Sequence, residues 1–262
     1  KNKVKKYKFI KNPSKIIDLK NTGWTIFRPG IGWEITFKWG FTCPKHLPGH
    51  AHSDLLTFDV YKNGNPIIVE AGTSTYQNNS IRGYERSGKA HNVIQLSSRK
   101  YEKDILNYKI IEPIDIWNSF RAGKKANTFG RFSRFEKTGI FTIQASHDGY
   151  KNIKTEYTRK LSIKLESKNT LLIDIKDIII TRNKLYWRKW IHLSPYIGDY
   201  FFKKFIKDLK NNNKNKFKII ETSYSEGFGK RKKRKSICFY GVTSKGYNTI
   251  ITKLNLNEIF ST

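Results

Sequence analysis

Short apolar runs that alternate with polar residues dominate the pattern of this chain. Such runs of roughly four to eight residues, rich in β-branched and aromatic side chains and bounded by turn residues, are typical of β-strands. The pattern predicts strands over 33–39, 55–61, 66–72, 91–97, 139–146, 159–166, 170–180 and 235–243. Turn signals separate them at 62–65, 147–152, 166–169 and 243–248.

One segment, 199–210, follows the helical period instead, because Phe202, Phe205, Ile206 and Leu209 fall on one face. Many short strands at this spacing favour sheets packed on sheets. We therefore predict an all-β fold, a large antiparallel β-sandwich or stacked-sheet domain with at most one or two short helices. We place this domain at 21–262 and interpret 1–20 as a lead-in from a missing upstream domain.

Composition narrows the class of protein. The chain has 262 residues, 37% of them apolar, which is enough to fill a sizeable core. No stretch approaches the roughly 20 apolar residues that span a bilayer, and no apolar run follows the basic start as a signal peptide would require. The sequence contains no Met, so we interpret it as a fragment or a processed product.

The formal net charge of +30 points to a polyanionic partner, such as nucleic acid, an anionic membrane or an acidic polysaccharide. Heavy use of Lys and Asn throughout, as in 210–220, offers a compositional explanation instead. The basic run 229–236 suggests nucleic-acid binding, but it fits a solvated hairpin tip, and no nucleic-acid-binding motif accompanies it. We do not expect nucleic acid to be the partner. Cys43 and Cys238 lie in no redox or zinc motif, so their pairing stays open.

The clearest local feature is a hairpin in which an Asn-Gly turn at 63–64 joins two alternating apolar runs. His50 and His52 precede its first strand, Glu70 ends its second strand, and His91 begins a later one. Imidazole nitrogen and carboxylate oxygen are ligands that Zn²⁺ prefers, so this region is a plausible zinc site.

A regular hairpin would keep these groups apart. With the turn at 63–64, Thr57 lies opposite Glu70, and His52 lies five residues further on, about 16 Å away at the usual strand rise. A shared metal therefore requires the segment that holds His52 to curl back, or Glu70 to reach beyond the hairpin.

The order of several motifs adds a family resemblance. GHAHSD at 49–54, PIIVEAGTSTY at 66–76, RGYERS at 82–87 and AHNVI at 90–94 follow one another as in the C-terminal β domain of heparinase II/III-like polysaccharide lyases. Weaker similarities extend to NTGWTIFR at 21–28, HDGY at 147–150 and WIHLSP at 190–195. The chain resembles that family over most of its length, and the specific part lies between about 49 and 95.

The resemblance implies roles for matched residues. His52, Glu70 and His91 would bind a zinc ion that supports the site, whereas His50 would face the substrate cleft. Relatives usually carry Asp at the position of Glu70, and the longer Glu side chain puts metal occupancy in question. The remaining catalytic groups of the family lie on an N-terminal α/α-toroid, which this chain does not contain.

The implied reaction is β-elimination on a uronic-acid polysaccharide. The proton at C5 becomes acidic when the neighbouring carboxylate is neutralised, a base then removes it, and an acid protonates the departing O4. We assign His50 as the base or the carboxylate neutraliser and Tyr84 as a candidate phenol. Arg82 and Arg86, which flank Tyr84, are candidates for binding the substrate carboxylate.

The leading hypothesis is therefore the C-terminal domain of a lyase for acidic polysaccharides, inactive without its helical domain and located in the periplasm, at the bacterial cell envelope or outside the cell. The alternative is a non-catalytic β module that binds acidic glycan or nucleic acid. A third hypothesis is a degenerate relative that has lost its activity.

Overall fold

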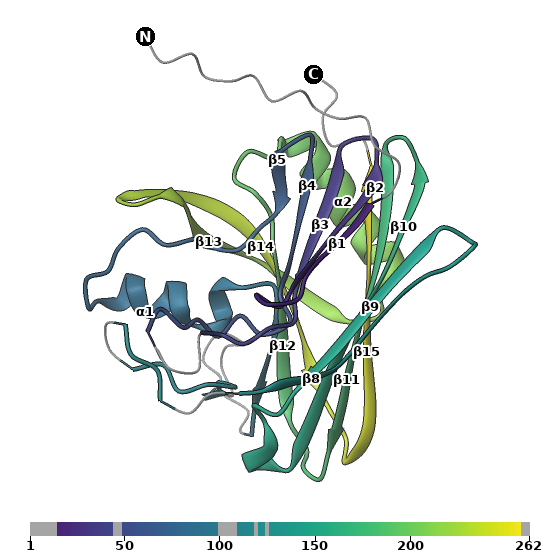
Figure 1. The fold of residues 1–262 in the computed structure, drawn as a ribbon. Coiled ribbons are helices and arrows are strands. Elements are labelled where there is room, and N and C mark those ends of the chain that lie inside the picture. The colour runs from purple at the N-terminus through teal and green to yellow at the C-terminus, as the bar shows by residue number, and fades with distance from the viewer. Residues whose placement is uncertain (1–14, 44–48, 99–108, 118–119, 124–125, 258–262) are drawn as a thin grey trace.

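Three antiparallel sheets of five strands each form the molecule in the computed structural model, which describes residues 15–43, 49–98, 109–117, 120–123 and 126–257 (Figure 1). The strand orders are β1-β2-β3-β4-β5, β15-β11-β10-β9-β8 and β13-β14-β12-β6-β7. Two α-helices and short 3₁₀ turns complete the described part. The predicted all-β fold of stacked antiparallel sheets is confirmed.

The elements have the following bounds. The first sheet contains β1 (Lys15–Leu19), β2 (Trp24–Gly30), β3 (Trp33–Lys38), β4 (Phe58–Lys62) and β5 (Asn65–Ile68). The second contains β8 (Thr128–Phe135), β9 (Ile140–His147), β10 (Thr155–Ser167), β11 (Thr170–Thr181) and β15 (Gly246–Asn257). The third contains β6 (Ile94–Ser97), β7 (Ile110–Ile111), β12 (Tyr186–His192), β13 (Lys216–Gly227) and β14 (Lys230–Val242). The helices are α1 (Ser80–Arg86) and α2 (Asp199–Asn212), and the 3₁₀ turns are η1 (Gly88–Ala90) and η3 (Lys151–Ile153).

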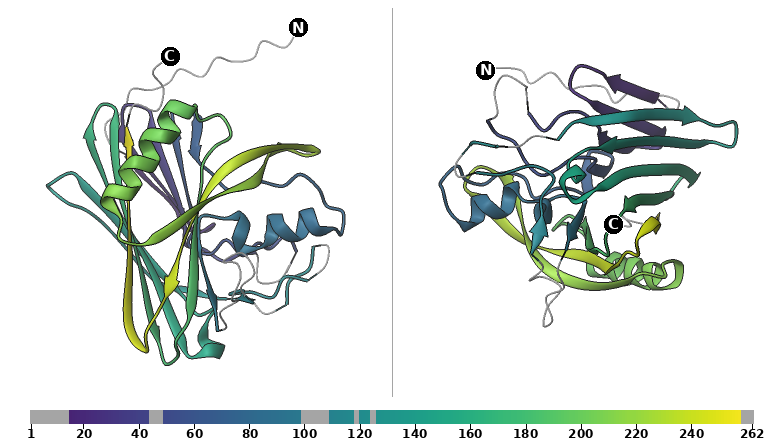
Figure 2. Two further views of the ribbon diagram at one scale, coloured as in Figure 1. Left: turned by 180° about the vertical axis from the view of Figure 1, so that it is seen from behind. Right: turned by 90° about the horizontal axis from the view of Figure 1, so that it is seen from below.

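One hydrophobic core joins the three sheets, with buried side chains from β3 and β4, from β10 and β11, and from β12 and β14. The two views in Figure 2 show α2 lying along the outside of this stack, next to β15. The helix buries Phe201, Phe205, Ile206 and Leu209, while Phe202 is only partly buried. The helix at 199–210 is confirmed, with its apolar face turned slightly from the expected one.

The sequence pattern identified β3, β4, β5, β6, β9, β10, β11 and β14 but missed the other strands of the described part. β12 reads YWRKWIH and contains two buried cations, Arg188 and Lys189, so its apolar alternation is interrupted. β13 mixes Lys, Glu and Ser with its apolar residues, and β15 is rich in Asn and Thr, so neither stands out from the composition of the whole chain. The chain around β1, at the end of the segment interpreted as a lead-in, pairs with β2 over Lys15–Leu19. Cys43 and Cys238 are both buried, and the two do not form a disulfide bond.

The Asn-Gly hairpin forms between β4 and β5, with positive φ at both Asn63 and Gly64 as a type I′ turn requires. Its register differs from the regular one. A β-bulge opposite Val60 leaves Ile67 as the extra residue of β5, so that Val60 lies opposite Ile68, and the ladder ends there. The expected pairing of Thr57 with Glu70 is therefore wrong, because Glu70 lies beyond the hairpin.

A buried ionic cluster lies where the second and third sheets meet. Asp177 of β11 accepts hydrogen bonds from the Tyr157 hydroxyl at 2.6 Å, from Arg159 Nε at 2.7 Å and from Lys189 Nζ at 2.9 Å. Both ion pairs have side chains that are fully buried. Burial alone would raise the pKa of Asp177, but Arg159 and Lys189 hold it well below its usual range.

This cluster gives a stability prediction. Asp177→Ala leaves two cations buried without a counter-charge and should lower the free energy of unfolding by about 3–5 kcal/mol. Asp174→Ala, which removes an exposed carboxylate from the same strand, should change it by less than about 0.5 kcal/mol. Urea denaturation of the two variants measures both values, and equal effects would contradict a special role for Asp177.

The same carboxylate contributes to the pH dependence of stability. Its folded-state pKa is depressed, so its contribution is complete above the unfolded-state value of about 3.9 and is lost as the pH falls below that value. Wild-type protein should therefore lose stability between about pH 5 and pH 2, and Asp177→Asn should lose less over the same interval. A parallel decline in both proteins would show that other carboxylates account for the acid sensitivity.

Candidate functional site

The chain changes sheets directly after β5. Ile68 forms a bridge with Leu193, and the Val69 amide donates to the His192 carbonyl at 3.0 Å. The Ala71 amide then donates to the Ala90 carbonyl at 2.9 Å. This crossing carries the residue between them, Glu70, away from the hairpin and to the start of β6.

The segment before β4 folds back as well. Leu56 has a positive φ of 61°, and the Thr57 amide closes a turn on the Asp54 carbonyl at 3.2 Å. Before this turn, the Ser53 amide donates to the Arg86 carbonyl at 2.8 Å. The histidine segment therefore runs beside α1 instead of extending β4.

These two departures bring the predicted metal ligands together. The rings of His52 and His91 have centroids 5.3 Å apart, and His91 Nδ1 lies 2.8 Å from Glu70 Oε1. The sequence analysis required one segment to curl back or the other to reach beyond the hairpin, and both occur. The spacing of residues along the chain could not predict that these side chains meet, because their meeting depends on a bulge and on a turn with an unusual backbone conformation.

The electrostatics of this cluster follow from burial and close charges. Burial, helped by the neighbouring His91 and Arg82, lowers the pKa of His52 to about 2, so its ring is neutral. Burial alone would lower the pKa of His91, but the Glu70 carboxylate raises it above its usual value. Asp59 Oδ1 accepts the Glu70 amide at 3.1 Å, and burial together with the charge of Glu70 raises the pKa of Asp59.

The side chains, as they stand, contact one another directly instead of converging on a metal position. Two atoms bound to one tetrahedral zinc at about 2.0–2.1 Å lie roughly 3.3 Å apart, whereas the contact of 2.8 Å between His91 and Glu70 is a hydrogen bond. Arg82 Nη1 lies 3.4 Å from His52 Nε2. In the described residues, no three His, Cys, Asp or Glu side chains are arranged to hold a metal ion. This arrangement does not fit zinc without rearrangement, and the zinc site stays a prediction.

The helix α1, which the sequence analysis missed, positions both predicted arginines. Asn79 caps it by accepting the Arg82 amide at 3.0 Å. The guanidinium of Arg82 is buried behind the ring of Tyr76, 5.3 Å from its centroid. Arg86 is also buried, and it donates to the carbonyls of Ala51 and of residues 117 and 121 at 2.7–2.9 Å. Arg86 therefore joins α1 to the segment of Ala51 and to the bonded residues 117 and 121, and it does not face solvent.

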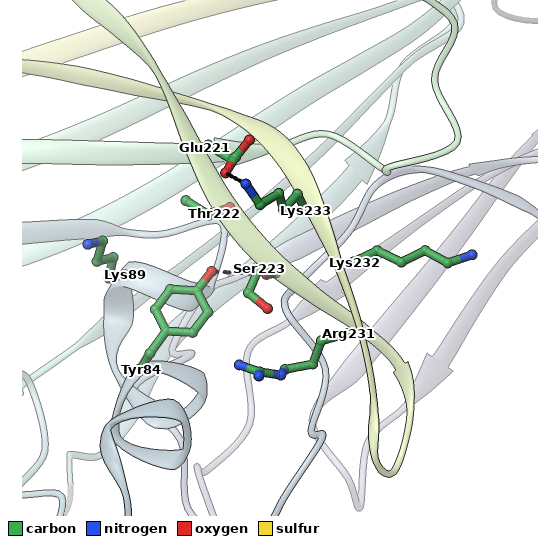
Figure 3. A pocket seen from close by; sticks show the side chains of 8 residues that line it. All are labelled: Tyr84, Lys89, Glu221, Thr222, Ser223, Arg231, Lys232 and Lys233. Atoms are coloured by element: carbon green, nitrogen blue, oxygen red, sulfur yellow. Dashed lines mark hydrogen bonds and ion pairs between the residues drawn. The ribbon is translucent and has the colours of Figure 1, made fainter.

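Tyr84 points to the other side of α1. Its hydroxyl donates to the Ser223 carbonyl of β13 at 3.1 Å. It lines an open pocket of about 470 Å³ between α1, η1 and the β13–β14 hairpin (Figure 3). The structure thus separates Tyr84 from the cluster of His52, Glu70 and His91, although the sequence placed all of them in one site.

His50 is exposed and belongs to a group of aromatic rings at the surface. Its ring centroid lies 5.6 Å from that of Tyr76 and 4.7 Å from that of Phe120, and Tyr76 lies 5.2 Å from Phe228. Tyr76 is 44% exposed and Phe228 is 65% exposed. We call Tyr76, Phe120 and Phe228, together with His50, the aromatic wall. Sequence reasoning missed Phe120 and Phe228 because they come from distant segments.

The β13–β14 hairpin reaches the aromatic wall because its tip is bonded to the loop after Glu70. The Ser225 amide donates to the Ala71 carbonyl at 2.6 Å, and the Gly229 amide donates to the Ser74 carbonyl at 2.8 Å. Gly72 makes this approach possible, because a Cβ there would lie 2.4 Å from the Ser225 carbonyl oxygen. The hairpin tip therefore delivers Phe228 to the side of Tyr76.

Asn92 lies between His91 and β6 and supports the site structurally. The sequence analysis included it in the motif at 90–94 but gave it no role. Its side-chain amide donates to the Phe58 carbonyl at 2.9 Å, and its Oδ1 accepts the His192 amide at 2.8 Å. Its own amide donates to Thr57 Oγ1 at 3.3 Å. One buried side chain thus fixes β4 and β12 against the segment that carries His91.

Comparison with known proteins matches residues 11–196 to the model of the family described as heparinase II/III-like, C-terminal. Among solved structures, heparan sulfate lyase from Pedobacter heparinus is 16% identical with a TM-score of 0.61 over 95% of this chain and 37% of that one. Heparinase III is 13% identical with a TM-score of 0.64 over 94% of this chain and 37% of its own. The chain therefore spans little more than a third of the solved proteins it resembles. No curated protein matches.

The zinc prediction can be tested by elemental analysis of purified protein. We expect about one zinc per chain in the wild type and loss of the metal in His52→Ala. The control His147→Gln, which changes a buried histidine outside the cluster, should retain the metal. A chain that contains no zinc and keeps its melting temperature in a chelator would contradict the prediction. The direct contact between Glu70 and His91 would then be the working arrangement.

Proposed function

Since this chain belongs to the heparinase II/III-like C-terminal family, we propose that it is the β domain of a polysaccharide lyase that cleaves an acidic, uronic-acid-containing glycan by β-elimination. The observation that carries the proposal is the position of His50, exposed within the aromatic wall and two residues before His52, which belongs to the cluster with Glu70 and His91. An imidazole can remove a proton, and neighbouring aromatic rings can hold the apolar face of a sugar ring.

In the proposed reaction, His50 contacts the uronate residue at the cleavage point. It takes the proton from C5 or donates a hydrogen bond to the carboxylate beside it. The electron pair of the C5–H bond forms the C4–C5 double bond, the C4–O4 bond breaks, and O4 leaves with a proton from an acid. Each role at His50 needs the imidazole open to the substrate, and His50 is the exposed histidine among the described residues.

The histidine is held in place by its backbone and its neighbours. His50 has a positive φ of 59°, and its amide donates to the Phe120 carbonyl at 3.0 Å. Residues other than glycine rarely adopt this left-handed backbone conformation, and surrounding contacts are needed to maintain it. The buried arginines support the same segment: Arg86 bonds the carbonyl of Ala51, and Arg82 contacts His52. We accordingly propose Arg82 and Arg86 as positioning residues.

The complete active site requires more than this chain. The chain spans 37% of the length of each of the two lyases above, so we propose that a further, helical domain of the same protein supplies the acid and the rest of the substrate cleft. We propose a location outside the cytoplasm, in the periplasm, at the cell envelope or secreted, where such glycans are met. In the described residues, no helix has the length and apolar character needed to cross a membrane.

The proposed activity predicts a measurable product. The full-length protein, incubated with heparan sulfate, hyaluronan or alginate, should raise the ultraviolet absorbance as unsaturated chain ends form. His50→Ala should lower the rate by about 10²–10⁴-fold, the usual contribution of a positioned acid or base. Because His50 is exposed, the variant should keep its melting temperature. A folded variant with wild-type activity would remove His50 from the mechanism.

The aromatic wall predicts an effect on substrate binding. Phe228→Ala should raise KM roughly 2- to 10-fold with a smaller change in kcat, since it removes one ring contact with the glycan. Phe132→Ala is a matched control, because Phe132 is 51% exposed but lies on β8, in another sheet. If both variants change KM equally, the wall has no specific role.

A further inference from the structure

The pocket beside Tyr84 collects positive charge from two distant parts of the chain (Figure 3). Its walls come from the end of α1 and η1 on one side and from the β13–β14 hairpin on the other. The residues that line it are Tyr84, Lys89, Glu221, Thr222, Ser223, Arg231, Lys232 and Lys233. The set holds four cations and one carboxylate.

The ion pairs within this set leave a net positive pocket. Lys233 Nζ lies 2.8 Å from Glu221 Oε1, and both side chains are largely exposed. Lys232 points away from the other side chains in Figure 3, and its ammonium lies 3.3 Å from Glu226 and 2.8 Å from the Tyr196 hydroxyl. Arg231 has no carboxylate partner among the described residues, and its guanidinium extends toward Tyr84.

The pocket is separate from the site at His50. Residues two apart on a helix point about 200° from one another, so Arg82 and Tyr84 leave α1 in nearly opposite directions. Arg82 contacts His52, whereas Tyr84 bonds the Ser223 carbonyl. The β13–β14 hairpin extends from one site to the other. Phe228 at its tip belongs to the aromatic wall, whereas Arg231 and Lys233 on β14 line the pocket.

We propose that this pocket is an accessory binding site for an anionic substituent, a sulfate or a carboxylate, of an acidic polysaccharide chain that runs along the β13–β14 hairpin from the aromatic wall. This inference rests on the proposed function for the kind of polymer. Arg231 is the main contact, because a guanidinium can bind a sulfate or carboxylate through two parallel hydrogen bonds. Lys89 lines the opposite wall with its ammonium 6.0 Å from the centroid of the Trp190 ring, so it adds positive charge to the pocket without being a direct contact. The Tyr84 hydroxyl fixes that wall to β13.

The charged residues of the pocket predict that some variants bind the polysaccharide more weakly and that one binds it more tightly. Arg231→Gln should weaken binding of heparan sulfate roughly threefold or more, and Lys89→Gln combined with Arg231→Gln should weaken it further. Glu221→Gln should strengthen binding, because it removes the one carboxylate that lines the pocket. Binding by the full-length protein is measured by titration calorimetry at several salt concentrations, and the double variant should show a shallower dependence on salt.

The control must remove equal charge elsewhere, because the chain has a net charge of +30. Arg134→Gln combined with Lys253→Gln removes two exposed cations from the second sheet, outside the pocket. This control should leave binding within about 1.5-fold of the wild type. If the control and the pocket variant weaken binding equally, only diffuse charge attracts the polymer and the proposal is overturned.

Binding measurements with four polymers identify which anionic substituent the pocket binds. Hyaluronan carries carboxylates without sulfates, dextran sulfate carries sulfates without carboxylates, heparan sulfate carries both, and duplex DNA carries phosphates. Loss of hyaluronan or of dextran sulfate binding in Arg231→Gln identifies the substituent and supports the proposal. DNA that binds more tightly than every glycan, with the same loss in the variant, would overturn it in favour of a nucleic-acid site.

The outcome is independent of the lyase assay. If the full-length protein cleaves none of the glycans but Arg231→Gln weakens binding as expected, the accessory site stands and the proposed reaction fails. If cleavage depends on His50 while the pocket variants bind and cleave as the control does, the proposed reaction stands and the accessory site is overturned.

Discussion

The buried carboxylate of Asp177 is the interaction on which the arrangement of the sheets depends. It is shared by Arg159 of β10 and Lys189 of β12, strands that belong to two different sheets. Arg159 also donates from Nη1 to the carbonyls of Leu56 and Asn92, at 3.0 and 2.5 Å. Those carbonyls belong to the turn before β4 and to the segment after His91. A single ionic cluster therefore joins the core to the two segments that carry the site.

This connection explains why the site can depend on irregular backbone. The turn at Leu56 and the bulge opposite Val60 leave the regular ladder, and an unsupported chain would not keep such conformations. Asn92 and Arg159 satisfy the carbonyls that these departures leave unpaired inside the protein. The buried hydrogen bonds thus fix the positions from which His52 and Glu70 approach His91.

Local sequence predicted those features that depend on neighbouring residues. The alternation in β10 and β11, the Asn-Gly turn and the helix at 199–210 each follow from the chain within a few residues, and each is present. The meeting of His52, Glu70 and His91 was expected only through the family resemblance, since regular pairing would have kept them apart. The basic run that contains Arg231 was expected at a solvated hairpin tip, but the neighbours of Phe228 and Arg231 could not be predicted, because they come from segments about 150 residues earlier.

The net charge indicates a polyanionic partner but not where it binds, because it does not distinguish cations that bond within the protein from cations that can bind a ligand. Arg86, Arg159 and Arg234 are buried, and each donates to backbone carbonyls inside the molecule. Within the basic run at 229–236, alternation along β14 turns Arg234 inward and leaves Arg231 at the surface. These buried cations are closed to a polyanion, which meets only the positive groups at the surface. The position of each cation in its strand, and the carboxylate nearest to it, decides where an anionic ligand can bind.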